Sequence, residues 1–465
     1  MLAPLSLLLA SFLHVRAITD TGARFGQALA HADVNGDGFS DVLVGEPFHD
    51  GVFADEGRVL LYLGSPAGLA ASPTWSLRGR QAAPHLGAGL AGIGDTNGDG
   101  FEDFVVAAPD FDLARRVIGG GPRARFHGPF PDAGALAVYF GSASGPVPSP
   151  ALVSTGREQH ERLGASLSAA GDVNGDGYDD VLVGAPGTAE SRGSARVFLG
   201  SPNGPGRVHA WIVVGDQVHS GFARFLTGDG DVDADGYDDV VVAAPDAGAS
   251  ANGRLLAYYG SASGLPTVHS WSREIAPVSF NNGTDLGTVA LVRSTSGDAY
   301  DDLLVGDPAW DSVGTINFRL DAGIARCFRG FHTGLLSNAH DFFLSGDPGD
   351  RVGLSIAGAG DVDGDGLGDA LCGMADGLFV ALGARNGGGI NWSFFIHAPI
   401  PDSGFGEALS SAGDVNGDGF DDVLVGEPRW DGAELDQGRV HVYLGPPDLG
   451  GSIRGWLSAS TLTAP

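Results

Sequence analysis

The chain repeats one alternation of apolar and polar segments seven times. Each repeat holds two apolar runs of strand length, rich in Val and Leu and closed by Gly, Ala or Pro. Such short, β-branched runs predict buried strands rather than helices. The first runs are 42–45, 104–108, 181–184, 240–244, 303–306 and 423–426, and the second runs are 58–64, 135–141, 195–200, 255–260, 325–330, 378–383 and 439–445.

Two further strands complete each repeat. A small-residue segment follows a hydrophobic-Gly pair, first Phe25-Gly26 and last Phe405-Gly406. A fourth strand is marked in most repeats by an aromatic residue, which predicts packing between repeats rather than ligand stacking. These aromatic residues are Trp75, Trp211, Trp271, Phe342, Trp392 and Trp456.

Four strands cannot bury both of their faces within one repeat, so the repeats must stack around an axis. We therefore expect an all-β fold, a seven-bladed β-propeller with four antiparallel strands in each blade, over residues 18–465. A closed ring also protects the edges of its sheets. The last repeat has its own fourth strand near 453–459, which predicts little or no strand exchange between the termini.

An Asp-rich nonapeptide precedes the first apolar run of each repeat. The copies start 53 to 77 residues apart and are DVNGDGFSD (33–41), DTNGDGFED (95–103), DVNGDGYDD (172–180), DVDADGYDD (231–239), STSGDAYDD (294–302), DVDGDGLGD (361–369) and DVNGDGFDD (414–422). Calcium prefers six to eight hard oxygen ligands. Oxygens at positions 1, 3, 5 and 9, the carbonyl at position 7 and a Gly at position 6 for the sharp turn match that preference.

The predicted calcium ligands come from six of the seven nonapeptides. They are Asp33, Asn35, Asp37, Phe39 and Asp41; Asp95, Asn97, Asp99, Phe101 and Asp103; Asp172, Asn174, Asp176, Tyr178 and Asp180; Asp231, Asp233, Asp235, Tyr237 and Asp239; Asp361, Asp363, Asp365, Leu367 and Asp369; and Asp414, Asn416, Asp418, Phe420 and Asp422. The Phe, Tyr and Leu residues contribute carbonyl oxygens. About six Ca²⁺ ions per chain are expected.

Two observations refine this prediction. EF-hands are excluded, because their bidentate Glu at position 12 is replaced by Val or Cys inside an apolar strand. Ordinary Asp-Gly turns would explain one copy, but not six copies with the same ligand spacing. The fifth nonapeptide keeps only Asp298 and Asp302 among its acidic ligand positions, so we expect it to bind metal weakly or not at all. The loops at 231–239 and 361–369 have four carboxylates each and should bind most tightly.

The overall charge is strongly negative and excludes some classes of partner. The net charge is −31 and there is no lysine, which argues against nucleic acid or anionic membrane as a partner. Residues 1–17 resemble a secretory signal peptide, with cleavage after Ala17. No membrane span is expected, and the protein should be secreted into an extracellular or periplasmic space.

Cys327 and Cys372 either form one disulfide or remain buried thiols.

These motifs together resemble the FG-GAP repeats of the integrin α-subunit propeller. Phe-Gly stands at 25–26 and 405–406, Leu-Gly at 86–87, 163–164 and 286–287, and Gly-Ala-Pro at 184–186 with Gly-Glu-Pro variants at 45–47 and 426–428. In that family, calcium loops brace the bottom of the propeller and loops of the opposite face meet ligands. This chain is similar to a free-standing secreted relative rather than to a whole receptor.

The opposite face therefore offers candidate partner-binding residues. In four loops between the second and third strands, an aromatic residue stands one or two positions before an Asp. These aromatic residues are Phe48, Phe111, Trp310 and Trp430. They fit either a protein or glycan ligand, or simple closure of the hairpins. An insertion at 110–133 carries Arg115, Arg116, Arg123 and Arg125, which fit an acidic partner or a solvated loop.

A calcium-binding interaction or adhesion module is thus the preferred function, and no catalytic residue is assigned. Nucleophile, nucleotide-binding and metalloprotease motifs are absent from the sequence. The alternative is a propeller-based enzyme, a lyase, hydrolase or phospholipase type, with a site at the central channel. Convergence of several His, Arg or carboxylate groups at one channel mouth would favour that alternative. A structural part of an envelope assembly is a third possibility.

Overall fold

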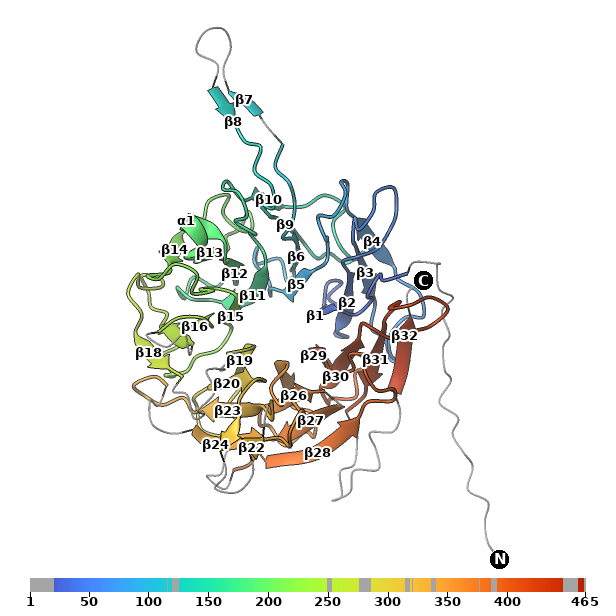
Figure 1. Cartoon of the computed structure of the whole chain (residues 1–465), viewed down its shortest axis with the longest axis vertical. Helices are drawn as coiled ribbons and strands as arrows, with labels where there is room; N and C mark the ends of the chain where they lie inside the picture. The colour runs from blue at the N-terminus through green and yellow to red at the C-terminus, as the bar shows by residue number, and fades with distance from the viewer. Residues whose placement is uncertain are drawn as a thin grey trace, which may run out of the picture.

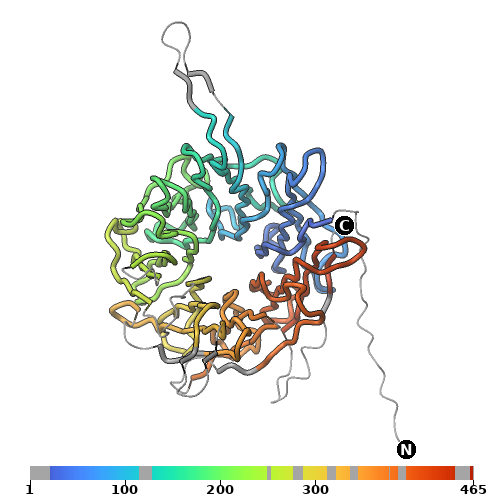
Figure 2. The backbone as a smooth tube through the Cα atoms, in the orientation of Figure 1, coloured from blue at the N-terminus to red at the C-terminus, as the bar shows by residue number. Residues whose placement is uncertain are grey.

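The chain forms a ring of seven four-stranded antiparallel sheets around a central channel (Figure 1). The computed structural model describes residues 21–114, 116–118, 125–248, 253–275, 286–313, 318–319, 321–335, 340–375, 377–385, 391–445 and 459–463. The proposed signal peptide and Trp456 lie outside these residues. The backbone trace passes once around the ring (Figure 2). The predicted seven-bladed propeller is confirmed.

The blades follow one another along the chain, each running from its innermost to its outermost strand. Blade 1 is β1 (Ala28–Ala32), β2 (Asp41–Glu46), β3 (Arg58–Tyr62) and β4 (Trp75–Arg78); blade 2 is β5 (Gly89–Gly92), β6 (Phe104–Ala108), β9 (Ala135–Tyr139) and β10 (Leu152–Thr155); blade 3 is β11 (Ser166–Gly171), β12 (Asp180–Ala185), β13 (Ser194–Phe198) and β14 (Trp211–Val214).

The second half of the ring has the same order. Blade 4 is β15 (Phe225–Thr227), β16 (Val240–Ala244), β17 (Arg254–Tyr258) and β18 (Trp271–Glu274); blade 5 is β19 (Val289–Val292), β20 (Asp302–Asp307), β23 (Ile324–Phe328) and β24 (His340–Ser345); blade 6 is β25 (Ile356–Gly360), β26 (Asp369–Met374), β27 (Gly377–Leu382) and β28 (Asn391–His397); blade 7 is β29 (Ala408–Gly413), β30 (Asp422–Glu427), β31 (Arg439–Tyr443) and β32 (Ala459–Thr463).

Two small hairpins are inserted between the second and third strands of a blade. In blade 2, β7 (Arg116–Ile118) pairs with β8 (Arg125–His127), and this hairpin extends away from the ring (Figure 1). In blade 5, β21 (Ser312–Val313) pairs with β22 (Phe318–Arg319). One short turn, α1 (Thr188–Ser191), lies at the corresponding place in blade 3. The side chains of the four arginines predicted to form a basic cluster lie outside the described residues.

Each blade contributes its own four strands, so the prediction of no strand exchange between the termini is confirmed. The fourth strand of blade 7 starts at Ala459, at the end of its predicted range. The ring closes instead through backbone contacts. The Phe25 nitrogen donates to Gln437 O at 3.0 Å, and Phe25 forms a parallel bridge with Gly438. Other blade pairs repeat this bridge, including Gly57 with Leu86.

The apolar core lies between blades rather than within them. One cluster joins Val42, Val44 and Tyr62 of blade 1 to Leu424 and Val440 of blade 7. The predicted aromatic column contributes directly to these interfaces. Trp75 on β4 packs edge-on against Phe104 and Tyr139 of blade 2. Trp211 packs against Tyr258 between blades 3 and 4, and Trp271 packs against Phe328 between blades 4 and 5. Packing between blades, rather than ligand stacking, is therefore the role of these three residues.

Glycines of the repeat permit the close approach of neighbouring blades. A Cβ atom at Gly45 would lie 2.1 Å from the carbonyl oxygen of Gly87 in the next blade. Gly87 itself has a φ of +89°, a conformation that residues with side chains rarely adopt. The hydrophobic-Gly and Gly-x-Pro motifs of the sequence thus meet each other in space. This meeting explains why both recur together.

Candidate functional site

The seven nonapeptides lie at one end of the ring, because each joins the first strand of a blade to the second. In six of them the position-1 carboxylate forms the centre of the turn. Asp33 Oδ1 accepts hydrogen bonds from the Gly36 and Asp37 nitrogens at 2.8 and 3.2 Å. Its Oδ2 accepts from the Gly38 nitrogen at 2.9 Å. The bond from the position-6 glycine recurs at Asp95, Asp172, Asp231, Asp361 and Asp414.

Positions 3 and 5 continue this wrapping of the loop. Asn35 Oδ1 accepts from the Asp37 nitrogen at 3.0 Å, and Asp37 Oδ1 accepts from the Phe39 nitrogen at 3.1 Å. The same bonds recur at Asn97, Asp99, Asn174, Asp176, Asn416 and Asp418. In these four loops the position-3 and position-5 side chains are therefore folded back onto the loop backbone.

The position-9 carboxylate is buried and fixed by two backbone donors. Asp41 Oδ2 accepts from the Val34 nitrogen at 3.1 Å, and its Oδ1 accepts from the Gly64 nitrogen at 2.8 Å. Burial raises the pKa of Asp41 to about 7, more than these hydrogen bonds lower it. Burial likewise raises the pKa of Asp103, Asp180 and Asp422 to about 7, and that of Asp239 and Asp369 to about 8.

Two loops bring three acidic groups within reach of a common ion. One carboxylate oxygen each from Asp231, Asp233 and Asp239 lie within 4.8 Å of one another, as do oxygens from Asp361, Asp363 and Asp369. These are the two loops with Asp at position 3. Burial and the like charges of Asp235 and Asp231 raise the pKa of Asp233. Such crowding of like charges is relieved by a cation.

The donor set of the blade 4 loop fits a hard divalent cation. Asp233 Oδ1 is buried and has no hydrogen-bond partner among the described residues. A buried carboxylate oxygen without a partner is costly, and calcium binds such oxygens at about 2.3–2.6 Å. Asp231, Asp233 and Asp239 would hold the ion in this loop.

The position-7 residue, predicted to supply a carbonyl oxygen, also has a packing role for its side chain. A Cβ atom at Gly36 would lie 2.8 Å from the ring of Phe101, the position-7 residue of the next loop. The same contact joins Gly175 to Tyr237 and Gly417 to Phe39, which closes the series around the ring. The recurrent Gly at position 4 is thus explained by an aromatic ring seated on it.

Position 8 is the functional position that sequence reasoning overlooked. Its carboxylate accepts a hydrogen bond from the position-1 backbone nitrogen of the preceding loop, which couples neighbouring blades. Glu102 pairs in this way with Asp33, Asp179 with Asp95, Asp238 with Asp172, Asp301 with Asp231, and Asp421 with Asp361, at 2.7 to 3.1 Å. The available signal was the first acid of the DD and ED endings.

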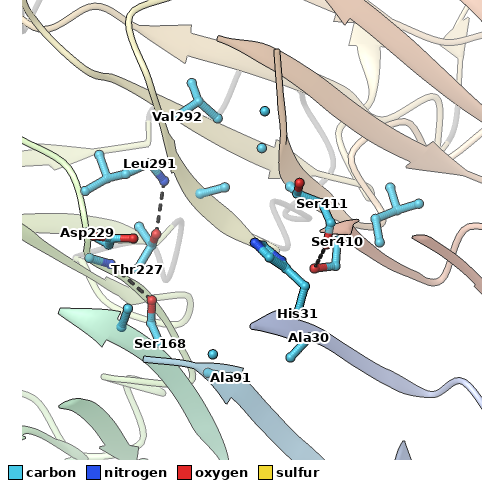
Figure 3. Close-up of a pocket in the computed structure, with 18 of the residues that line it drawn as sticks. Ala30, His31, Ala91, Ser168, Thr227, Asp229, Leu291, Val292, Ser410 and Ser411 are labelled. Atoms are coloured by element: carbon cyan, nitrogen blue, oxygen red, sulfur yellow. Dashed lines mark hydrogen bonds between the residues drawn. The ribbon is translucent and has the colours of Figure 1, made fainter. Parts of the chain in front are cut away.

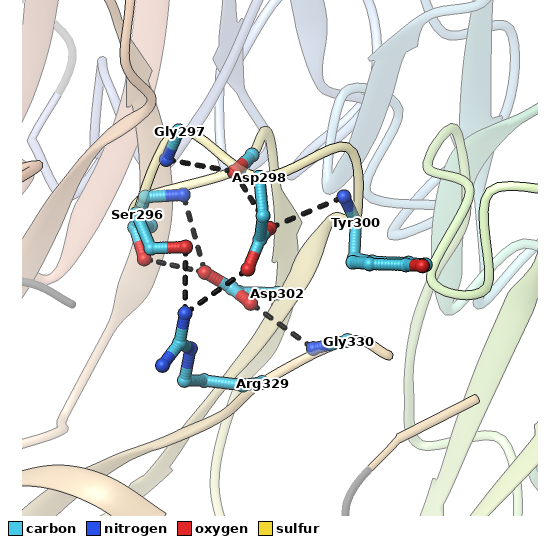
Figure 4. Close-up of polar contacts among 9 residues, drawn as sticks. Ser296, Gly297, Asp298, Tyr300, Asp302, Arg329 and Gly330 are labelled. Atoms are coloured by element: carbon cyan, nitrogen blue, oxygen red, sulfur yellow. Dashed lines mark hydrogen bonds and ion pairs between the residues drawn. The ribbon is translucent and has the colours of Figure 1, made fainter. Parts of the chain in front are cut away.

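The fifth loop differs from the other six. Ser294 Oγ takes the place of the position-1 carboxylate and accepts from the Gly297 nitrogen at 3.1 Å. Arg329 Nη2 lies 2.7 Å from Ser296 Oγ and 3.0 Å from Asp298 Oδ2 (Figure 4). Burial opposes ionisation of Asp298, but its hydrogen bonds with Ser296, Tyr300 and Ser294 and the charge of Arg329 outweigh burial and lower its pKa.

The innermost strands line a channel of 550 Å³ (Figure 3). His31, Asp229 and Arg293 line this channel, together with small and apolar residues and two of the position-8 acids, Glu102 and Asp421. These two carboxylates hold neighbouring loops together. Charged groups thus converge at the channel, but Glu102 and Asp421 are engaged with backbone nitrogens, which does not favour the enzyme alternative.

The four candidate partner-binding aromatics occupy the opposite end. Trp310 is buried at 9% exposure, and Phe48, Phe111 and Trp430 are half-buried. Phe48 stacks near His85 with ring centroids 4.8 Å apart, and Arg439 lies over the Trp430 ring at 4.8 Å.

The acids that accompany these aromatics are used within their own loops. Asp50, Asp112, Asp311 and Asp431 each accept, through Oδ1, a hydrogen bond from the nitrogen of an Asp shortly before the third strand, at 2.8 to 2.9 Å. These four Asp donors all have positive φ, which the hydrogen bond stabilises. Each of these four acids therefore closes its own hairpin.

Cys327 and Cys372 are buried thiols in one apolar cluster between blades 5 and 6, and they form no disulfide. Burial raises the pKa of Cys372 to about 12, which keeps it as an unreactive thiol. Of the two alternatives for this pair, the structure shows the second.

The class defined by this fold and these loops is a seven-bladed β-propeller with Asp-rich turns at one end. The FG-GAP repeat family matches at residues 25–62, 163–211 and 405–443. The chain therefore carries FG-GAP repeats, on a propeller like the one at the N-terminus of integrin alpha subunits.

Curated relatives include several integrin alpha subunits. Integrin alpha-4 of Xenopus laevis is 36% identical over 169 residues, which are 35% of this chain and 14% of the relative. Integrin alpha-IIb of Mus musculus is 36% identical over 174 residues, or 36% of this chain and 15% of the relative. Integrin alpha-5 of Xenopus laevis is 29% identical over 55% of this chain and 22% of the relative. The match thus spans less than a quarter of these relatives.

A solved structure shares the fold at low identity. The crystal structure of BBS1N in complex with ARL6DN, soaked with mercury, aligns with a TM-score of 0.50 at 9% identity, over 94% of this chain and 98% of that one. Across the part of the chain that the structure describes, no helix is long and apolar enough to cross a membrane.

Proposed function

We propose that this protein is a secreted, calcium-braced propeller that serves as an extracellular interaction or adhesion module. The observation that carries the proposal is the approach of the position-1, -3 and -9 carboxylates to one another in the loops at 231–239 and 361–369. In the blade 4 loop this arrangement leaves a buried carboxylate oxygen of Asp233 without a hydrogen-bond partner. Calcium would neutralise the crowded acids and so contribute to folding stability.

Through the position-8 contacts, calcium bound in one loop would also stabilise the contact with the neighbouring blade. Five of the loops donate their position-1 nitrogen to the next blade, while their position-1 carboxylate would hold the ion. Ordering one loop therefore orders the contact to its neighbour. A rigid ring is a suitable support for a binding face at its opposite end, where Phe48, Phe111, Trp310 and Trp430 remain our candidate partner contacts.

A thermal melt with excess chelator and with millimolar calcium tests the metal proposal. We expect a higher melting temperature with calcium and about six bound ions per chain by calorimetric titration. An unchanged melt would refute the structural role of calcium. Capture from extracellular material, with calcium and then with chelator, tests the interaction proposal. Partners retained only with calcium would support it, and turnover of glycan or lipid substrates would favour the enzyme alternative instead.

A further inference from the structure

Arg329 occupies the fifth loop in a way that no other blade repeats. It directly follows β23, and its guanidinium contacts the side chains at loop positions 3 and 5, Ser296 and Asp298 (Figure 4). The exposed fraction of the Arg329 side chain is 19%, so the contact is largely shielded from water. In the other loops these two positions are predicted to supply metal ligands.

The same register position is apolar in every other blade. It directly precedes the glycine whose nitrogen donates to the position-9 carboxylate, as Gly330 donates to Asp302 Oδ1 at 3.0 Å. The residues at this position in the other six blades are Leu63, Phe140, Leu199, Tyr259, Leu382 and Leu444. The one blade that lacks acids at positions 1 and 3 is therefore the one blade that has a cation at this position.

The fifth loop nevertheless keeps the turn of the others. Asp298 Oδ1 accepts from the Tyr300 nitrogen at 3.2 Å, as Asp37 Oδ1 does from Phe39. Ser294 Oγ donates to the same oxygen of Asp298 at 3.0 Å. The single carboxylate of Asp298 is matched by the single charge of Arg329. A dication placed here would meet two carboxylates, Asp298 and Asp302, instead of the three or four of the other loops, beside a fixed positive charge.

We propose that the Arg329 guanidinium is the resident cation of the fifth loop and replaces a metal ion there. Blade 5 is then held in its closed form without metal, while the other six loops depend on calcium. Only that contrast rests on the proposed function. The role of Arg329 itself follows from its contacts with Ser296 and Asp298.

The first test measures melting of Arg329→Leu in excess chelator. Leu is the residue of four other blades at this position, so packing is preserved. We expect a melting temperature several degrees below that of the unaltered chain, and a similar decrease with calcium, because calcium does not reach this loop. Arg329→Lys should recover part of the loss by restoring the charge. A melt of Arg329→Leu equal to that of the unaltered chain would overturn the proposal.

A matched control is Arg385→Leu. Arg385 Nη2 donates to the backbone carbonyl of Asp365 in the sixth loop at 2.7 Å, and that loop has four carboxylates. Its loss should change the chelator melt less than the loss of Arg329. An equal decrease for both variants would show a general effect of surface arginines and would contradict a special role for Arg329.

The second test rebuilds a metal loop. Ser294→Asp, Ser296→Asp and Ala299→Gly together restore the pattern of the other blades. Combined with Arg329→Leu, we expect one additional bound calcium per chain by calorimetric titration. With Arg329 retained, we expect none. An additional ion bound equally well beside Arg329 would refute its role. If the unaltered chain binds no calcium, the proposed function fails, and the chelator melt still decides the role of Arg329.

Discussion

The carboxylate of Asp238 lies across a blade boundary from Asp172, whose backbone nitrogen donates to Asp238 Oδ2 at 2.7 Å. The Asp238 nitrogen in turn donates to the Asp172 carbonyl at 3.3 Å. This two-way contact joins the nonapeptide ends of blades 3 and 4. A charged acceptor on a backbone donor is worth roughly 1.5–3 kcal/mol, so each of the five such contacts helps to hold two neighbouring blades together.

Asp238→Ala should therefore destabilise the fold. The Asp172 nitrogen would lose its acceptor, while repulsion between Asp238 and neighbouring acids would also disappear. We expect a net loss of about 1–2 kcal/mol in denaturant unfolding. Asp238→Asn keeps an oxygen acceptor and should lose less. Ser40→Ala is the matched control, because position 8 of the first loop has no carboxylate. An equal loss for Ser40→Ala and Asp238→Ala would contradict the role of the charged contact.

Asp233→Asn should separate metal binding from folding in the blade 4 loop. Because Asp233 Oδ1 has no hydrogen-bond partner among the described residues, an amide costs little in the absence of metal. In chelator we expect the variant to melt at or slightly above the temperature of the unaltered chain, because a like charge beside Asp231 and Asp235 is removed, and in calcium we expect it to melt lower. Calorimetric titration should show one weakened site.

Asn35→Asp is the converse change, in a loop with three carboxylates, and should strengthen one site.

For Asp233→Asn, a lower melting temperature in chelator than that of the unaltered chain would indicate that Asp233 has a structural role without metal.

Ala234 replaces a glycine of the repeat, and its backbone conformation is unfavourable for alanine. It has a φ of +56°, whereas other loops have glycine at this position. Left-handed conformations cost a residue with a side chain roughly 1–2 kcal/mol, so Ala234→Gly should stabilise the protein by about 1 kcal/mol or less after the entropy of glycine is included. The reverse change, Gly175→Ala, places a Cβ 2.6 Å from the Tyr237 ring and should destabilise. Denaturant unfolding measures both, and a gain for Gly175→Ala would be inconsistent with this account.

Trp211→Ala should test the packing between blades. Trp211 meets Tyr258 with ring centroids 5.0 Å apart, and its Nε1 donates to Pro266 O at 2.8 Å. Loss of a large aromatic side chain from a core costs about 3–5 kcal/mol. Val208→Ala is the control, since Val208 is 71% exposed and should change stability little. Similar losses for both variants, measured by denaturant unfolding, would argue against the interface.

The sequence was sufficient to predict what repeats along the chain. The features that could be predicted are local patterns that recur, namely the apolar runs such as 42–45, the nonapeptides, and the aromatic column of Trp75, Trp211 and Trp271. Their recurrence predicted the strands, the loops and the blade interfaces. Contacts between repeats were harder. The Asp238 contact depends on which loop lies beside Asp172 in space, and the contact of Arg329 with Asp298 joins residues separated by a strand pair. The register of neighbouring blades sets the Asp238 contact and is a property of the closed ring, whereas the pairing of β20 with β23 inside blade 5 sets the Arg329 contact.

Asp229→Asn should change the pH dependence of stability. Asp229 is exposed to the channel (Figure 3), and its incomplete solvation there, followed by the like charges of Asp238, Asp179, Asp301 and Glu102, raises its pKa to about 6 from an ordinary value of 3.8. A raised acid pKa means that the folded state binds the proton more tightly than the unfolded state. Stability from this group is therefore present below about pH 4 and is lost as the pH rises through about 6.

Replacing Asp229 by Asn removes that ionisation. We expect the variant to be more stable than the unaltered chain at pH 7.5 and nearly equal to it at pH 4.5, in denaturant unfolding at matched calcium and salt. Salt should reduce the difference at pH 7.5, because it screens repulsion among the channel acids. Asp246→Asn, at an exposed position in the turn after β16, is the control and should give no such pH dependence. A variant less stable than the unaltered chain at pH 7.5 would show that ionised Asp229 is stabilised by its surroundings, and that the channel favours negative charge.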